Sequence, residues 1–513
     1  MPLTAYSQYP VVLPRYSRDG ARASWLRAHA SDIVLLATVQ AALFIPGAGA
    51  AIALGLLCVF SLFGVDRAIK ALLVSALATF ANPAVFHTQV HVAEFKWLLL
   101  LFGLWATIKA PRTNFRYPAG IIVSAALFLG TAAFVSLLFG LSPALSMFKL
   151  ASFALGLVTT FRLAARTKTD IEEWTNFLIV FWLWVVAVSL PLLFISAGSG
   201  GPRATGDFGF QGVISHPQSF AVLIAALPAI AFLRSLTTPG KMAFAWMLVG
   251  AVGIFMLFES RARTGMLACF LSSAVTVLVY LSKGSRNRMR VVGRLIALFF
   301  VSLLIVLMSG GAIIVAVQSA LHKHTNTGQE LDWSMATVAQ LLNSRKAQIN
   351  QQTEVVNEEP FTGTGFGVQN TGQVEHAGEP ESSFMGIPLS SPNEPGFLPL
   401  AVLAQVGVAG ALFFWIGICC LFSAVLKGRR PEAMGLFTVL LAVNLGEAIG
   451  FSFGGLGLYM WMGIALAVRG SFPMTGMGRT LALARRGGMA SLVPLKGSKS
   501  RLAPEAIASR GIR

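Results

Sequence analysis

The sequence predicts an all-α protein that crosses a membrane about fourteen times. Hydrophobic residues make up 55% of its 513 residues, charged residues only 12%, and the mean hydropathy is +0.71. Apolar runs that approach the ~20 residues of a membrane-spanning helix recur along most of the chain. When these runs alternate across a bilayer, most Lys and Arg residues gather on one side. Helices are expected because a helix satisfies its own backbone hydrogen bonds in lipid.

Fourteen apolar windows define the expected spans. They lie at 33–46, 48–64, 70–86, 97–109, 119–139, 145–161, 175–196, 219–233, 242–258, 264–282, 295–317, 397–424, 433–449 and 455–468. Several are shorter than the ~20 residues of a full span, so twelve spans is the alternative count. The cysteines, Cys58, Cys269, Cys419 and Cys420, all fall inside these windows and are expected to be buried, small apolar side chains.

The distribution of positive charge sets the expected orientation. With the N-terminus inside, 31 of the 39 Lys and Arg residues lie on the inner side and 8 on the outer side, and the reverse orientation inverts this ratio. Both termini are therefore expected inside. Residues 1–31 and 470–513 form basic tails, the second disordered, around a transmembrane domain at 32–469. The same asymmetry accounts for the net charge of +18 without a nucleic-acid partner.

One long insertion, at 318–396, is expected on the outer side. It carries 9 acidic and 3 basic residues, and its 79 residues are too many for a passive connector. Apolar residues recur at helical spacing in its first half, at Trp333, Val338, Leu341 and Leu342. This spacing predicts one or two amphipathic helices that lie on the membrane face.

A glycine-rich stretch, EEPFTGTGFGVQN (358–370), follows that helical region. Gly363, Gly365 and Gly367 resemble the glycines of a nucleotide phosphate loop. No strand is predicted before them, however, and no helix opening with Lys-Ser or Lys-Thr follows, as a nucleotide loop requires. We interpret them as a turn in which positive φ angles end the loop helix and redirect the chain. The backbone amides of this turn are a further candidate for contacts to a substrate phosphate.

Arginines on the outer side form the candidate binding site. Arg261 and Arg263 flank one turn, ESRART, at the mouth of two spans, and Arg203 and Arg345 lie on the same side. Guanidinium groups bind phosphate through paired hydrogen bonds, so these arginines predict an anion site. The alternative is that Arg261 and Arg263 extend to lipid headgroups, with Glu259 as a partner.

Histidines offer weaker candidates. His376 is the histidine best placed near the other polar groups of the long loop, although a plain surface role is the alternative. His87 and His91 are four residues apart, a spacing that suits a metal pair on a helix, but no third ligand accompanies them. No metal and no cofactor are predicted.

The order of these motifs resembles a family of membrane enzymes. Four stretches carry the resemblance: RATGDFGFQGVISHPQSFA (203–221), ESRARTGML (259–267), NSRKAQINQQTEVVNEEPFTGTGFG (343–367) and SPNEPGFLPLAVLAQVGVAGALFFW (391–415). They are similar, in turn, to an arginine–glycine segment followed by an Asn/His-Pro-Asn turn that opens a helix, a Ser-Arg helix start, a loop arginine followed by P-x-x-G-x-G-x-G, and a segment that re-enters the membrane. Together, over about residues 150–425, the chain resembles the O-antigen ligase and O-antigen/exopolysaccharide polymerase superfamily.

The resemblance implies a metal-independent glycosyltransferase of the C-type fold in the bacterial inner membrane. Its donor would be an undecaprenyl-pyrophosphate-linked glycan, held by arginines on the periplasmic face, where the long loop lies. The acceptor would be a second glycan or lipid A-core, and a chain-length regulator and a flippase are implied partners beside membrane lipids. Arg203, Arg263 and Arg345 match the family's arginines, with Arg261 as the rival of Arg263.

The general base and the exact reaction stay open at this point. Ligases of the family commonly show His-Asn where this chain has Pro392-Asn393-Glu394, so Glu394 or His376 is the expected base. The missing histidine favours polymerisation of exopolysaccharide or O-antigen repeat units over ligation to lipid A-core. Two further alternatives are a polysaccharide flippase or other transporter, and a membrane scaffold without chemistry.

Overall fold

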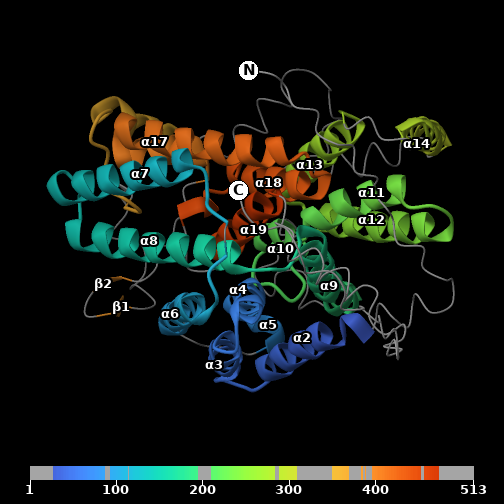
Figure 1. Cartoon of the computed structure of the whole chain (residues 1–513), viewed down its shortest axis with the longest axis horizontal. Coiled ribbons are helices and arrows are strands. Elements are labelled where there is room, and N and C mark those ends of the chain that lie inside the picture. The colour runs from blue at the N-terminus through green and yellow to red at the C-terminus, as the bar shows by residue number, and fades with distance from the viewer. Residues whose placement is uncertain are drawn as a thin grey trace, which may run out of the picture. The chain divides into compact units, whose positions relative to one another are not determined.

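The described part of the chain is a bundle of α-helices with one short β-hairpin (Figure 1). The computed structural model describes residues 27–86, 93–113, 115–194, 209–282, 288–308, 349–368, 383–384, 387–388, 396–451 and 456–472. The chain divides into Met1–Pro473 and Met474–Arg513, and all of the described residues belong to the first unit. The predicted tails at 1–31 and 470–513 therefore lie almost wholly outside the described residues.

In chain order the helices follow the apolar windows. They are α2 (Ala30–Leu43), α3 (Gly49–Ser61), α4 (Val65–Thr79), α5 (Pro83–Phe86), α6 (Ala93–Lys109), α7 (Ala119–Leu138), α8 (Pro143–Arg166), α9 (Ile171–Ser189), α10 (Pro217–Ile224), α11 (Ala226–Thr237), α12 (Lys241–Glu259), α13 (Arg263–Ser282), α14 (Arg288–Met308), α17 (Leu398–Gly428), α18 (Pro431–Ala442) and α19 (Leu456–Gly470), with 3-10 turns η1 (Leu190–Phe194), η4 (Val443–Leu445) and η5 (Ile449–Phe451). Strands β1 (Ser383–Phe384) and β2 (Ile387–Pro388) pair antiparallel. Several helices, among them α8, α10 and α18, begin with proline, whose fixed φ suits the first turn.

By helix length and hydropathy, the chain is a multi-pass membrane protein. Among the described residues, seven helical segments are long and apolar enough to cross a membrane. In the most apolar 18 residues of the segment formed by α10 and α11, 83% of the residues are buried, whereas in α12 the share is only 22%. The first segment therefore lies inside the bundle and the second on its flank. Large apolar side chains such as Phe244 of α12 and Leu278 of α13 are 65% exposed, as lipid contact requires. Cys419 is likewise exposed on α17, which corrects the expectation that all of the cysteines are buried.

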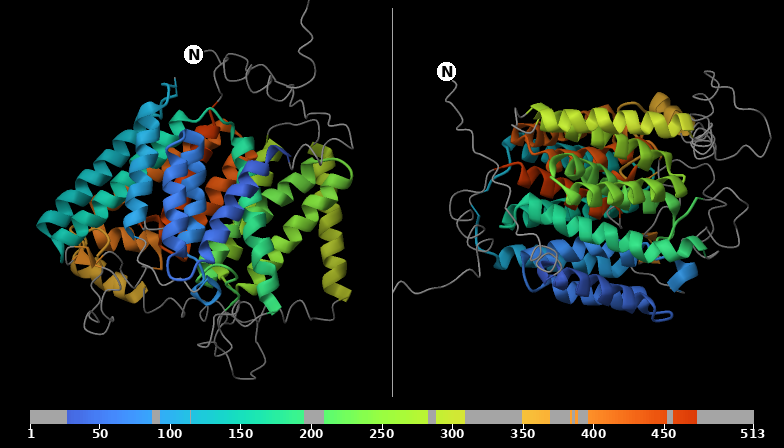
Figure 2. Two further views of the ribbon diagram at one scale, coloured as in Figure 1. Left: turned by 90° about the horizontal axis from the view of Figure 1, so that it is seen from below. Right: turned by 90° about the vertical axis from the view of Figure 1, so that its right-hand side faces the viewer.

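The centre of the bundle is α19, all of whose residues are buried. Figure 1 shows α7, α8 and α17 on one side of it and α11 to α13 on the other. Figure 2 shows that the helices run roughly side by side and that the short helical segment 349–358 lies at one end of them. This segment is the described part of the predicted amphipathic region. It ends directly before the glycine-rich stretch, as expected.

A break in α17 is the main irregularity of the bundle. Gly407 has φ 64° and ψ −177°, so the helix is interrupted in its first third. The carbonyls of Ala404 and Gln405 instead accept from the amides of Thr364 and Gly365, at 2.9 and 3.0 Å. The amide of Val408, in turn, donates to the carbonyl of Pro360 at 3.0 Å. The backbone groups freed by the break are thus satisfied by residues 360–368, which we call the glycine turn.

Glycines allow the two chain segments to approach each other. Gly363, Gly365 and Gly367 have φ angles of 65°, 96° and 71°, in agreement with the turn expected from the sequence. A Cβ added at Gly363 would lie 2.7 Å from the carbonyl carbon of Gln405. One added at Gly407 would lie 2.0 Å from the carbonyl oxygen of Phe361. Only glycine therefore fits on both sides of this contact.

Side chains from α7, α8 and α17 hold the other face of the glycine turn. Phe366 is fully buried, and its ring lies 4.9 Å from that of Phe451 in η5 and 5.2 Å from that of Phe153 in α8. Lys149 of α8 donates to the carbonyl of Gly367 at 2.8 Å. The turn is thereby packed into the helical core, and we call the end of the bundle that contains it the glycine end.

Ion pairs gather at the opposite end, which we call the basic end. The carboxylate of Asp170 accepts from the amide of Ile171 at the start of α9 and pairs with Arg430 at the start of α18. Arg234 of α11 pairs with Glu432 of α18 at 3.0 Å. These contacts join α9, α11 and α18 where the sequence places many of its basic residues.

The packing of the glycine turn yields a stability prediction. Gly363→Ala forces a φ of 65° on alanine and also drives its Cβ into the backbone of α17. We expect it to cost at least ~2 kcal/mol more than a change that imposes the backbone strain alone. Thermal unfolding of the detergent-solubilised protein measures the difference.

Gly240→Ala is the matched control, because Gly240 has the same φ of 65° and no atom lies within 4 Å of an added Cβ. Equal stability losses for Gly363→Ala and Gly240→Ala would contradict the tight contact described for the glycine turn.

Candidate functional site

The turn between α12 and α13 carries the two described candidate arginines. Ser260, Arg261 and Ala262 connect the helices, and Arg263 is the first residue of α13. Arg261 has φ 51°, a left-handed backbone that costs a residue other than glycine ~1–3 kcal/mol. Both arginines are half-buried. We call residues 259–264 the arginine turn.

Neighbouring backbone holds the arginine turn in this strained form. The amide of Phe210 donates to the carbonyl of Glu259 at 2.8 Å. A Cβ added at Gly209 would lie 1.9 Å from the carbonyl oxygen of Ser260. The chain before α10 therefore lies directly on the turn and fixes the direction in which Arg261 leaves it.

The same segment is tied to the rest of the glycine end. Asn82 donates through its side chain to the carbonyl of Gly212 at 2.7 Å, and its amide donates to the carbonyl of Val213 at 2.9 Å. His216 then caps α10 by accepting from the amide of Gln218 at 3.3 Å. The arginine turn thus rests on a segment that is itself anchored, so the position of Arg261 is set by several elements.

On its other side, the first turn of α13 meets the link between α18 and α19. A Cβ added at Gly446 would lie 2.0 Å from the hydroxyl oxygen of Thr264. A Cβ added at Gly265 would lie 2.8 Å from that of Ala221 in α10. Small residues therefore bring three elements together around the N-terminus of α13.

This link is a second irregular segment inside an apolar region. Asn444, in η4, donates to the carbonyl of Leu440 at 2.9 Å and accepts from the amide of Gly450 at 2.8 Å. The indole of Trp461 donates to the carbonyl of Gly450 at 2.7 Å. Glu447 lies between the two turns and is only 9% exposed.

Asn444 and Glu447 were not among the residues expected from the sequence. The signal was present: Asn444-Leu-Gly-Glu447 places an amide and a carboxylate inside the apolar window 433–449. Ionisable side chains within membrane segments are rare and mark functional positions. Mean hydropathy over the window does not separate these two residues from the apolar side chains around them.

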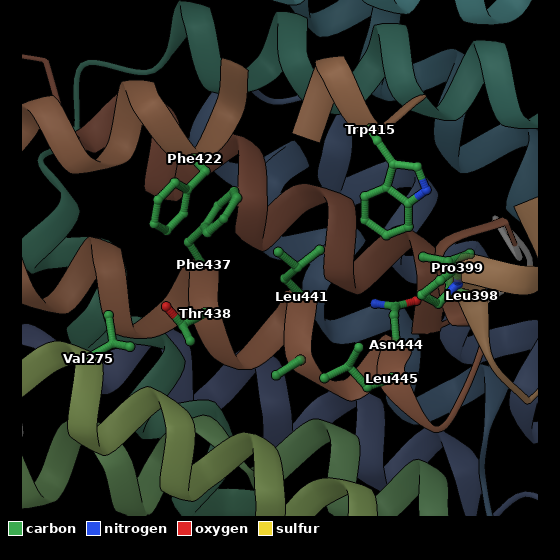
Figure 3. A pocket seen from close by; sticks show the side chains of 11 residues that line it. Val275, Leu398, Pro399, Trp415, Phe422, Phe437, Thr438, Leu441, Asn444 and Leu445 are labelled. Carbon is green, nitrogen blue, oxygen red and sulfur yellow. The ribbon is translucent and has the colours of Figure 1, made fainter. Parts of the chain in front are cut away.

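An apolar groove runs along the flank of the bundle beside this link (Figure 3). It has a volume of about 240 Å³ and lies between α13, α17 and α18. Its lining residues are Val275, Leu398, Pro399, Trp415, Phe422, Phe437, Thr438, Leu441, Ala442, Asn444 and Leu445. Phe422 and Leu445 are 39% and 45% exposed, so the groove is open along its side.

The groove and the arginine turn meet at the glycine end. Leu398 lies in the groove and also packs on Gly450, where a Cβ would be 3.2 Å from its side chain. Asn444 and Leu445 line the groove immediately before Gly446, which packs on Thr264. An apolar chain in the groove would therefore have its end close to the N-terminus of α13.

The glycine turn supports this region and does not offer free amides to it. The amides of Gly363 to Val368 donate to the carbonyls of Glu359, Ala404, Gln405 and Gly365 and to the side chains of Ser136 and Gln405. The prediction that these amides contact a substrate phosphate is therefore wrong, because each of them already has an acceptor within the protein. The turn reaches the second irregular segment through Phe366, which packs on Phe451.

The remaining candidates lie outside the described residues. These are Arg203 and Arg345 of the predicted anion site, the alternative bases His376 and Glu394, and the pair His87 and His91. Among the described residues, no group of three or more His, Cys, Asp or Glu residues is placed to hold a metal ion.

No protein-family model matches this sequence, and no curated protein matches it.

The strained backbone of Arg261 yields a second prediction. Arg261→Gly removes the left-handed strain, whereas Arg261→Ala keeps it, so we expect the glycine variant to be more stable than the alanine variant by ~1 kcal/mol. Arg429, with φ 50° and at the basic end, offers the same pair of substitutions as a control. At both positions, the glycine variant should have a higher thermal unfolding temperature than the alanine variant. An Arg261→Ala protein more stable than Arg261→Gly would show that residue 261 is not held in this conformation.

Proposed function

We propose that this chain transfers glycan from an undecaprenyl-pyrophosphate-linked donor at the periplasmic face of the bacterial inner membrane. The reaction is polymerisation of exopolysaccharide or O-antigen repeat units. The single observation that carries the proposal is Arg261, held in a strained conformation beside Arg263 at a helix N-terminus that adjoins an apolar groove. Strain of this kind persists where the surrounding structure enforces it, commonly at ligand sites.

The arginine turn has the chemistry of a pyrophosphate site. Two guanidinium groups can each donate paired hydrogen bonds to phosphate oxygens. The N-terminus of α13, a helix of 20 residues, adds the positive end of a helix dipole. Arg203 and Arg345, which the proposed topology places on the same side of the membrane, would complete the set.

The groove suits the lipid part of the donor. Each buried methylene group contributes ~0.8 kcal/mol, so even a short stretch of a polyprenyl chain gains several kcal/mol in an apolar channel. The groove is open along the flank of the bundle, so a lipid could enter sideways from the bilayer. Its end beside Asn444 would then bring the pyrophosphate to the arginine turn.

Glycosyl transfer at this site needs no nucleotide, because the donor is already activated. The acceptor hydroxyl attacks the anomeric carbon, the bond from this carbon to the pyrophosphate oxygen breaks, and undecaprenyl pyrophosphate leaves. The arginines stabilise the charge that develops on the leaving group. Glu394 or His376 takes the proton from the acceptor hydroxyl.

The proposal includes a topology of fourteen spans, with both termini in the cytoplasm. It is supported by the helices that occupy the apolar windows and by the ion pairs at the basic end, which would face the cytoplasm. The glycine end and the long loop at 318–396 would face the periplasm. Twelve spans is the alternative count.

A polysaccharide flippase is the second candidate, favoured by the break in α17. Transporters often use discontinuous helices, but in matching positions of two related halves. In the described residues the irregular segments are neighbours in the chain, in α17 and between α18 and α19. This placement favours the glycosyltransferase.

Reconstitution tests the proposed reaction directly. Purified protein in proteoliposomes, supplied with an undecaprenyl-pyrophosphate-linked repeat unit alone, should produce a ladder of longer lipid-linked glycans. Product that forms only when lipid A-core is added identifies a ligase instead. Movement of the lipid-linked glycan across the bilayer without any new glycosidic bond would overturn the enzymatic proposal.

Arg263 should be essential in the same assay. We expect Arg263→Ala to lower the rate ~100-fold and Arg263→Lys ~10-fold, because lysine keeps the charge but loses the paired hydrogen bonds. Arg288→Ala is the control. Arg288 is also the first residue of an apolar helix, α14, but it is exposed and lies outside the proposed site. Unchanged turnover by Arg263→Ala, at normal abundance in the membrane, would exclude Arg263 from the pyrophosphate site.

A further inference from the structure

Glu447 is a buried carboxylate beside the arginine turn to which the proposed mechanism gives no role. It is 9% exposed, and of the other described acidic residues whose burial is known only Asp32 is similarly buried. Asp32 is paired with Lys70 and accepts from His29 as well. A carboxylate buried to this degree needs a cationic or hydrogen-bonding partner, because its desolvation is otherwise too costly.

The fold brings Glu447 to the arginine turn. Its neighbour Gly446 is in direct contact with Thr264, the residue after Arg263. The contact is close enough that no side chain fits at residue 446. Glu447 directly follows Gly446, and Arg263 directly precedes Thr264. The contact between Gly446 and Thr264 therefore brings Glu447 close to Arg263.

The backbone around Glu447 is fixed. Its amide donates to the carbonyl of Val443 at 3.1 Å, and its carbonyl accepts from the amide of Ile449 at 2.8 Å. The side chain of Asn444 holds Gly450 from the other side of the link. The carboxylate is therefore carried on a rigid segment and can orient a partner with little loss of entropy.

A buried carboxylate beside the arginine turn has a favourable electrostatic effect on its two guanidinium groups. Two guanidinium groups on one short turn repel each other before an anion arrives, and their long side chains can adopt many rotamers. A buried carboxylate beside them lowers the repulsion and selects one arrangement through charge-assisted hydrogen bonds. The site then keeps a positive charge for the ligand and is ordered in advance.

We propose that Glu447 pairs with Arg261 and Arg263 and orients their guanidinium groups to receive the donor's pyrophosphate. This inference rests on the proposed function for the identity of the ligand. Glu447 is a positioning residue: it acts through the arginines and takes no proton from the acceptor. Its contribution is to the affinity for the pyrophosphate.

A double-mutant cycle on stability tests the pairing without any ligand. Glu447→Gln, Arg263→Gln and the double variant are compared by thermal unfolding of the full chain in detergent, and the same is done with Arg261→Gln. We expect the double variant to be less destabilised than the sum of the single changes in at least one of the two cycles. The expected difference is about tenfold in the unfolding constant, or about 1.4 kcal/mol. Additive effects in both cycles would overturn the pairing.

Binding of undecaprenyl pyrophosphate to the detergent-solubilised protein tests the function of the pair. Glu447→Gln should weaken binding about tenfold, because the arginines lose their orientation. Glu447→Asp, which keeps the charge with a shorter reach, should weaken it less. Glu172→Gln is the control: it removes an exposed carboxylate from the first turn of α9, at the basic end and away from the arginine turn, and should leave the affinity unchanged.

Two outcomes distinguish a failure of the positioning role of Glu447 from a failure of the proposed function. Normal binding by Glu447→Gln or, where that variant does not fold, by Glu447→Asp would overturn the positioning role. If such a variant also loses turnover, Glu447 acts in the chemistry instead. No binding by the unaltered protein would overturn the proposed function, whereas the stability cycle still decides whether Glu447 and the arginines are paired.

Discussion

The structure depends on the need to satisfy every backbone hydrogen bond at membrane depth. The break at Gly407 leaves carbonyls and an amide of α17 without helical partners, which is costly in lipid. The glycine turn meets this need from a different part of the chain, with hydrogen bonds to Ala404, Gln405 and Val408. Because these bonds require close approach of two backbones, they dictate glycine at 363 and 407. The position of Phe366, and through it the packing of η5, follows from the same contact.

The candidate site is built from irregular segments that this anchoring makes possible. η5 continues the link that contains Asn444 and Glu447, and this link packs on the start of α13. On the opposite side, the segment before α10 holds Arg261 in a left-handed conformation. Regular helices supply a rigid frame, and the breaks between them supply the polar groups. The charged ligand and the apolar lipid of the proposed donor need this combination.

The sequence was sufficient to predict the all-α, multi-pass class of the fold but only part of the site. Apolar windows predicted the helices because hydropathy over ~20 residues reports directly on burial in lipid. The spacing of Gly363, Gly365 and Gly367 predicted a turn, since positive φ angles are almost confined to glycine. The break at Gly407 was not predicted, because its cause lies in a contact with residues about forty positions earlier. Glu447 was not predicted for a related reason. It lies near Arg263 because Gly446 packs against Thr264, and a single sequence does not reveal this contact.

The order of the segments along the chain also bears on how the protein is made. The glycine turn and its supports on α7 and α8 all precede α17, so they are synthesised before the helix whose break they satisfy. When α17 enters the bilayer, the partners for its unpaired carbonyls already exist on the nascent chain. The hydrogen bonds between the glycine turn and α17 thus tie the packing of this helix to a segment that precedes it in the chain.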